Sequence, residues 1–220
     1  MGLFDKFKDK YKDKKETGEV TAYGWCAITS EFERIYPDQT NPKHYGTLVK
    51  WSLGGNDPLD GISIYDGGEF WHFVTYGMTE LYEKEEENDG ISGFGYEMTF
   101  KLKKETYSDE ESELKCICGI LQAIARITFT KGELFEPFEY LYTGQTMGID
   151  ARQMSNITGF ICVPDPSVNT IDTPNGKVSF LEFIGMTDSE LKTLSTRQSV
   201  MDIYERLGSD VTDYHRNSLV

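Results

Sequence analysis

The sequence predicts an α+β fold, a single compact domain in which a mixed, mostly antiparallel β-sheet is flanked by α-helices. Residues 61–65 and 70–76 are apolar runs joined by Asp-Gly-Gly-Glu, a pattern typical of a β-hairpin. Residues 94–102 alternate apolar and polar side chains, as a strand with one buried face does. Residues 109–130 carry apolar side chains at helical spacing after an acidic first turn, which indicates a long amphipathic helix.

The elements before the hairpin are shorter. Ser30 and Glu33 have the spacing of a capping box, and we expect a short helix that opens there and ends at Pro37. Residues 44–53 have the composition of a strand, and the Gly-Gly-Asn-Asp-Pro stretch after them indicates a turn. The polar, acidic residues 78–92 are expected to form a loop.

The second half of the sequence predicts more strands and two short helices. The long helix should end near Lys131-Gly132, and a long connection over 133–155 follows it. The remaining elements expected are strands at 156–163 and 177–185, a short helix opened by a capping box of Thr187 and Glu190, and a helix over 197–207 that stops at Gly208.

The sequence predicts a single domain, because its composition does not change along most of the chain. No internal repeat or linker-like change of composition occurs between residues 20 and 208. We therefore expect a basic N-terminal extension at 1–19, one domain over 20–208 and a polar C-terminal tail at 209–220.

The charge of the chain is unevenly distributed. Its 22 Lys and Arg against 37 Asp and Glu give a formal net charge of −15. Residues 1–15 hold six Lys and three Asp, so the remaining residues 16–220 carry a net charge of −18. Such a body would repel nucleic acid and anionic membrane, which argues against direct binding to either. A basic protein is the partner that this charge favours.

The N-terminal extension has a pattern of its own. Leu3, Phe4, Phe7 and Tyr11 are placed at helical spacing among lysines, a pattern that suits contact with a membrane surface or a partner helix. A short solvated tail is the interpretation we favour for such a segment.

The cysteines and the apolar runs predict a cytoplasmic protein. Cys26, Cys116, Cys118 and Cys162 lack C-x-x-C spacing, and buried reduced thiols are the simplest account of them. No apolar run has the length of a signal-peptide core or of a transmembrane segment.

A search for catalytic and metal-binding motifs finds no candidate. The chain has no phosphate-binding loop, and His44, His72 and His215 have no metal-ligand spacing with one another. His72 lies within an apolar strand, where a hydrogen-bonded core histidine is the expected role. The carboxylates are numerous but have no fixed spacing. We therefore expect no enzyme activity, no cofactor and no metal site.

A binding surface is then the remaining candidate for a functional site. The segment between the predicted strands at 70–76 and 94–102 presents an aromatic side chain and a cluster of carboxylates: Tyr82, Glu83, Glu85, Glu86, Glu87 and Asp89. One interpretation is a solvated acidic face that maintains solubility. The other is an electrostatic landing site for a basic protein, because complementary charge speeds encounter and selects the partner.

Three blocks of sequence resemble a known family. They are FWHFVTYGMTELYEKE (70–85), SGFGYEMTFKLKK (92–104) and IDTPNGKVSFLEFIGMTDSEL (171–191), the last with a TP-x-G-x-V-x-FL-x-x-x-G pattern. In order and spacing over 44–207 the chain resembles the Suppressor of Fused family. The resemblance covers only the N-terminal domain of the animal proteins.

The resemblance implies a compact mixed domain without catalytic activity. Animal members hold a Gli transcription factor peptide as a strand between two domains, and the family's partner-facing elements read here as Leu81-Tyr82 and Asp89-Gly90. For single-domain bacterial members the resemblance suggests immunity proteins that neutralise toxins, often nucleases.

The sequence therefore leaves two functions open. The first is a bacterial immunity protein or antitoxin that occludes a basic toxin domain. The second is an intracellular regulatory module that holds a protein or peptide by strand addition. An unrecognised hydrolase ranks far below both, and the product of the neighbouring gene would separate the first two.

Overall fold

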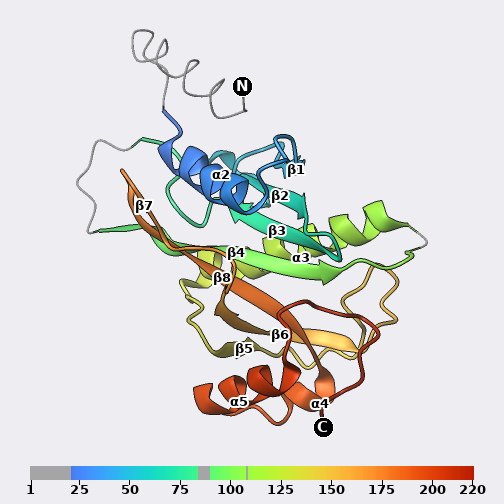
Figure 1. Ribbon diagram of the computed structural model, residues 1–220. Helices are drawn as coiled ribbons and strands as arrows, with labels where there is room; N and C mark the ends of the chain where they lie inside the picture. The colour runs from blue at the N-terminus through green and yellow to red at the C-terminus, as the bar shows by residue number, and fades with distance from the viewer. Residues whose placement is uncertain (1–20, 84–89, 108) are drawn as a thin grey trace.

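One twisted sheet runs through the whole molecule (Figure 1). The computed structural model describes residues 21–83, 90–107 and 109–220. Within these ranges the strands are β1 (Lys43–Gly46), β2 (Gly61–Asp66), β3 (Phe70–Tyr76), β4 (Ile91–Lys103), β5 (Glu139–Leu141), β6 (Ile157–Pro164), β7 (Ile171–Thr173) and β8 (Gly176–Thr187). Their order in the sheet is β1-β2-β3-β4-β8-β6-β5, with β7 paired to β8.

The sheet is mixed, with a single parallel pair at its centre among the described strands. β4 and β8 run parallel, from Ile91 beside Lys177 to Phe100 beside Phe183. Every other pair is antiparallel, including the expected hairpin of β2 and β3. The predicted α+β class with a mostly antiparallel sheet is confirmed.

Helices cover both faces of this sheet. They are α2 (Tyr23–Ile35), α3 (Glu110–Lys131), α4 (Asp188–Leu191) and α5 (Arg197–Leu207), with one 3₁₀ turn, η2 (Trp51–Leu53). α3 lies behind the sheet in Figure 1, whereas α2 and the pair of α4 and α5 lie against the two ends of the opposite face. No helix in the described ranges is long and apolar enough to cross a membrane.

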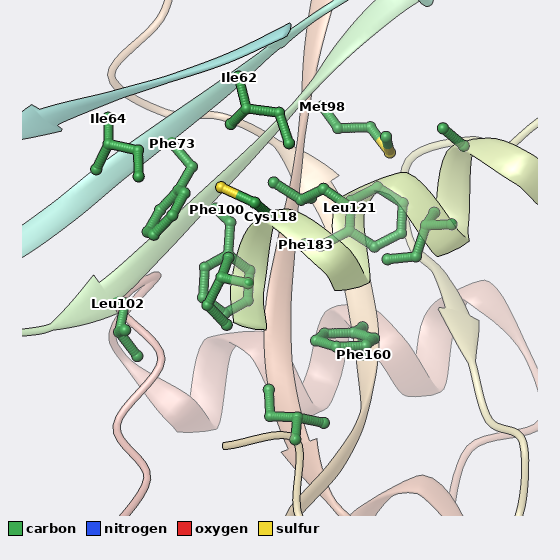
Figure 2. Close-up of a cluster of buried hydrophobic side chains, with 14 of the residues drawn as sticks. Ile62, Ile64, Phe73, Met98, Phe100, Leu102, Cys118, Leu121, Phe160 and Phe183 are labelled. Atoms are coloured by element: carbon green, nitrogen blue, oxygen red, sulfur yellow. The ribbon is translucent and has the colours of Figure 1, made fainter. Parts of the chain in front are cut away.

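The main core lies between the sheet and α3. Successive strand residues point to opposite faces, so β3 directs Phe73 toward α3 and Val74 toward α2. Figure 2 shows Phe73, Phe100 and Phe183 from three strands near Cys118 and Leu121 of α3. Full burial of such a side chain contributes about 1.5–3 kcal/mol, so this face supplies much of the stability of the fold.

The ends of the long helix are set by its capping residues. The Asp109 carboxylate accepts a hydrogen bond from the backbone N–H of Ser112 at 3.2 Å, and acidic residues occupy the first turn. Gly132 ends the helix with φ of 72°, and its N–H donates to the carbonyl of Thr128. Both ends agree with the sequence prediction.

Two predictions about the first fifty residues are wrong. α2 begins at Tyr23, so Ser30 lies inside the helix, where its hydroxyl donates to the carbonyl of Cys26 instead of capping. The strand expected over 44–53 is only β1, which ends at Gly46 and is followed by a loop that contains η2. The short strands β5 and β7 were not predicted.

The last twelve residues, expected to be a polar tail, pack onto the domain. Thr212 pairs with Leu102 beside β4, and its hydroxyl accepts a hydrogen bond from the N–H of Gly185 at 2.8 Å. Tyr214 is buried in the main core. Arg216 forms an ion pair with the buried Glu190 at 2.5 Å, so contacts with the domain continue beyond residue 208.

Candidate partner-binding surface

Tyr82 is held at the surface by two charged neighbours. This residue is 37% exposed, although the preceding residue, Leu81, is buried. The Lys50 ammonium lies 4.2 Å from the ring centroid and donates to the phenol oxygen at 3.0 Å. The phenol donates in turn to the carboxylate of Asp60 at 3.3 Å, and Lys50 pairs with the same carboxylate at 3.0 Å. The three side chains fix the position of the aromatic ring.

The chain reaches Tyr82 through a turn organised by one buried carboxylate. Glu97 of β4 is fully buried and accepts hydrogen bonds at 2.6 Å from the hydroxyls of Thr75 and Thr79. The backbone N–H groups of Gly77 and Thr79 donate to it at 3.0 Å each. Burial raises the pKa of Glu97 to about 7, against the lowering effect of these hydrogen bonds. This carboxylate therefore fixes the path of the backbone before Tyr82.

A buried amide secures the same segment from the other side. Asn175 lies in the turn between β7 and β8, and its side-chain amide donates to the carbonyl oxygens of Glu80 at 2.7 Å and Tyr82 at 3.0 Å. Because Asn175 is buried, these hydrogen bonds replace contacts with water that the two carbonyls would otherwise make. Asn175, which lies within the TP-N-G motif, thus fixes the backbone on both sides of Leu81 by hydrogen bonds.

Two glycines let the backbones approach closely here. Gly77 has φ of 128°, and a Cβ at this position would lie 2.9 Å from the N atom of Asp60. Gly93 has φ of 53°, and its Cβ would lie 2.8 Å from the carbonyl oxygen of Met78. Larger residues at either position would displace the turn.

Two pockets lie on either side of the loop 47–58, which we call the Leu48 loop. A pocket of about 240 Å³ opens beside Tyr82, where Trp51 and Phe129 supply apolar walls and Lys50 and Asp60 supply charge. A larger pocket of about 630 Å³ lies between this loop and α3, lined by residues that include Gln122 and Arg126. Concave, mostly apolar surfaces with a few polar groups are typical of binding sites.

The structure describes two of the six predicted site residues. Tyr82 forms the exposed centre of the surface. Glu83, the next residue, is also exposed, and its backbone N–H donates a hydrogen bond to the carbonyl of Thr21 at 2.7 Å. Glu85, Glu86, Glu87 and Asp89 lie outside the described residues.

Sequence reasoning missed three residues that build the surface. Lys50 fell within the strand expected over 44–53, and neither Asp60 nor Asn175 was given a role at this surface. Their roles depend on contacts across 32, 22 and 93 positions of the sequence. The TP-N-G motif was the one signal in the sequence that pointed toward Asn175.

The histidine that sequence analysis singled out belongs to the interior. His72 is fully buried, its Nδ1 lies 2.8 Å from the phenol oxygen of Tyr36, and its Nε2 lies 3.0 Å from the carboxylate of Asp165. Burial lowers its pKa, which favours the neutral ring. The prediction of a hydrogen-bonded core histidine is confirmed.

His72 is part of an ionic cluster, the polar band, in which every member but the partly exposed Asp210 is buried. Its members are His72, Lys101, Asp165, Glu182 and Asp210. Lys101 sits at the centre, with its ammonium 3.1 Å from Asp165, 3.0 Å from Glu182 and 2.7 Å from Asp210. Across the described part of the chain, no group of three or more His, Cys, Asp or Glu side chains is placed to hold a metal ion.

The fold and the Tyr82 surface together define a small α+β domain that presents a preformed aromatic patch. The family model of the Suppressor of fused protein (SUFU) matches residues 55–217. The human Suppressor of fused homolog is 33% identical over 181 residues, which cover 76% of this chain and 36% of the human protein. The chain belongs to the Suppressor of fused family, and it spans about a third of the length of the curated relatives it matches.

Solved structures show the same relationship. A chain in the crystal structure of the Sufu–Fu complex matches with a TM-score of 0.75 and 30% identity, over 89% of this chain and 91% of that chain. A SUFU homolog from Neisseria gonorrhoeae matches with a TM-score of 0.53 and 13% identity, over 90% of this chain and 97% of that chain. At that identity the second match shows a shared fold.

Proposed function

We propose that this chain is a non-catalytic protein-binding domain of the bacterial immunity or antitoxin kind. It binds a basic toxin domain, such as a nuclease, and neutralises it by occluding the surface that the toxin uses. Binding is stoichiometric and needs no cofactor.

The observation that carries this proposal is the exposed Tyr82 side chain, which a run of carboxylates follows in the sequence, on a body with a net charge of −18. Rigid aromatic side chains are enriched among the residues that dominate binding energy, because they bury a large area at small entropic cost. A nuclease is basic where it grips phosphate, so an acidic inhibitor can associate with that surface quickly.

The relatives support protein binding as the general role. The matching chain in the Sufu–Fu complex is in complex with Fu. The homolog from Neisseria gonorrhoeae shows that the same fold occurs in a bacterial protein.

The Tyr82 surface can be tested with one substitution and a matched control. Tyr82→Ala should weaken binding to the toxin encoded beside this gene by about 30-fold or more, since truncation of a central aromatic anchor costs about 2 kcal/mol or more. Tyr140 has the same exposed fraction, 37%, and lies on β5 at the other edge of the sheet. Tyr140→Ala should leave the affinity unchanged in calorimetry, and equal losses in both variants would contradict the proposed surface.

The role of the acidic segment is tested by association kinetics. Reversal of charge at Glu85, Glu86 and Glu87 to Lys should lower the association rate and its dependence on salt, because steering falls when local complementarity is lost. A control variant with the exposed Asp38, Asp202 and Glu205 changed to Lys has the same net charge. If both triple variants associate equally fast, the segment is a solvated face and not a landing site.

Neutralisation itself is tested in cells. Co-expression of this chain with the neighbouring toxin should rescue growth and yield a complex of the two proteins. A toxin that kills equally with and without this chain, and forms no complex with it, would overturn the immunity role for that pair.

A regulatory module that holds a peptide by strand addition is the second candidate. β1 has a strand partner on one side only within the described chain, so its outer edge is open to a further strand. Partner binding by this route should slow hydrogen exchange at the amides of residues 43–46. Occlusion through the Tyr82 surface alone should leave those amides unaffected.

A further inference from the structure

The Leu48 loop carries an apolar surface next to the candidate site. Leu48 is fully exposed, and Leu53 and Val49 are 77% and 50% exposed. The loop separates the two pockets described above, and Lys50 connects it to Tyr82. Clustered exposed aliphatic side chains at the rim of a pocket mark a surface that another segment covers.

The N-terminal segment leaves the domain at the rim of the same surface. The carbonyl of Thr21 accepts the hydrogen bond from Glu83, the residue after Tyr82, and the N–H of Gly24 donates to the carbonyl of Leu81 at 3.1 Å. The ring of Trp25 lies 5.4 Å from that of His44 on β1, the strand that leads into the Leu48 loop. The first twenty residues are therefore tethered beside Tyr82.

The sequence of this segment complements the surface in two ways. It holds Leu3, Phe4, Phe7 and Tyr11 at helical spacing, which supplies apolar side chains for an apolar loop and its pockets. Its first fifteen residues carry a net charge of +3, whereas the rest of the chain carries −18. Charge thus favours contact of the segment with the body of the chain, and burial favours contact with the apolar loop.

Because the segment is covalently joined to the domain at Thr21, it can reach the Leu48 loop. Twenty residues span roughly 30 Å as a helix and about 65 Å when extended, so the apolar side chains can reach the loop. A segment joined by a short linker acts at an effective concentration in the millimolar range. Even weak intrinsic affinity would then keep the surface occupied.

We propose that residues 1–19 dock onto the Leu48 loop and the Tyr82 pocket of their own chain. The segment is a tethered competitor that a protein partner must displace. The displacement step rests on the proposed function, but the docking does not. An anionic membrane is the less favoured occupant, because the −18 body would be repelled by it, and a second copy of the chain would repel the first in the same way.

Photo-crosslinking in the full chain tests the docking without any partner. A benzophenone amino acid placed at position 7 should crosslink within the same chain to residues 47–58 and 80–82, as mapped by mass spectrometry at low micromolar concentration. The double variant Leu48→Asp and Leu53→Asp should reduce the yield at least fivefold. Both positions are exposed, so thermal unfolding by circular dichroism should show an intact fold.

A matched control uses two other exposed apolar side chains. Met147 and Met154 lie in the loop between β5 and β6, and a double change of both to Asp should leave the crosslinking yield unchanged. Crosslinks to another face, crosslinks between chains, or crosslinks absent altogether would each overturn the proposal. Vesicles of phosphatidylcholine and phosphatidylglycerol provide a further test. If the chain co-sediments with them and the internal crosslinks are lost, the segment binds membrane and the proposal is overturned.

Displacement is measured separately from docking. Deletion of residues 2–15 should tighten binding to the toxin about 3- to 10-fold, because no competitor has to leave. If the internal crosslinks form but the toxin does not bind, the docking stands and the immunity role fails. If the toxin binds but the crosslinks are absent, the docking fails and the immunity role stands.

Discussion

At the scale of single residues, Glu97 links stability to the candidate surface. A carboxylate in the interior costs free energy unless hydrogen bonds compensate its lost hydration. Here two threonine hydroxyls and backbone N–H groups of the turn converge on it. The sequence showed only an alternating strand with Glu97 among its polar positions. Its burial arises because the turn at Gly77–Thr79 folds over that side of β4.

Glu97 should make stability depend on pH in a definite direction. Its pKa is about 7 in the folded chain against 4.5 ordinarily, so the folded state binds the proton more tightly than the unfolded state. The contribution of Glu97 to the free energy of unfolding should therefore be largest below pH 4.5 and fall by about 3 kcal/mol as the pH rises to 7.

Urea unfolding at pH 5 and pH 7.5 measures this contribution. In the Glu97→Gln variant the side chain does not titrate, so the loss of stability between the two pH values should be smaller than in the parent chain. Identical pH dependence in the two proteins would show that Glu97 does not titrate in this range.

At the scale of elements, one face of α3 is fully buried against the sheet, and the opposite face has room for larger side chains. Leu114, Ile117 and Leu121 are fully buried against the sheet. Gly119 lies on the exposed side, in the wall of the larger pocket, and a Cβ there would meet no atom within 4 Å. A glycine inside a helix costs stability relative to alanine, because the unfolded chain gains more freedom.

Gly119→Ala should stabilise the protein by about 0.5–1 kcal/mol. The matched variant Gly93→Ala should instead destabilise it by about 1–3 kcal/mol, because φ is 53° and the new Cβ would collide with the carbonyl of Met78. Chemical denaturation of the three proteins measures both effects. A destabilised Gly119→Ala protein would show that the helix is not regular at this position.

At the scale of the whole molecule, the polar band joins parts that are far apart in the sequence. Its residues come from β3, β4, β8 and the segments that follow β6 and α5. The band lies on the face that α2 covers at one end and α5 at the other, between two apolar clusters. The hydrogen bond with His72, and after it the charge of the Lys101 ammonium, holds the pKa of Asp165 well below its usual range, against the raising effect of burial.

Lys101→Met should destabilise the protein by about 3–5 kcal/mol, because it leaves buried carboxylates without their cation. Lys103 is the next lysine on β4 and pairs with Asp213 at 2.7 Å, but its side chain is half exposed. Lys103→Met should cost less than about 1 kcal/mol. Equal destabilisation of the two variants in urea would contradict a central role for the polar band.

Local patterns predicted the elements well and the contacts between them poorly. The capping of α3 and the alternation of β4 lie within short stretches of sequence, so both could be predicted. Ser30 and Glu33 had the spacing of a cap, but apolar contacts of Trp25 and Ile28 with the sheet extend the helix past them toward its N-terminus. Tertiary packing overrode the local signal there.

The candidate site shows the same division. Tyr82 could be identified from the sequence and the family blocks, because the residue and its neighbours form one continuous segment. Lys50, Asp60 and Asn175 come from other parts of the chain, and no local pattern connects them to Tyr82. Only the folded backbone brings these groups together.

The parallel pairing of β4 with β8 also dictates the order in which the protein can assemble. Residues of β4 lie beside residues more than eighty positions later in the chain. Contacts over such separations form slowly, because a long loop must close first. During synthesis β1 to β4 can form a meander, but one edge of β4 stays uncovered until β8 has left the ribosome. Nascent chains that end before residue 187 should therefore expose an unpaired, aggregation-prone strand edge and depend on chaperones.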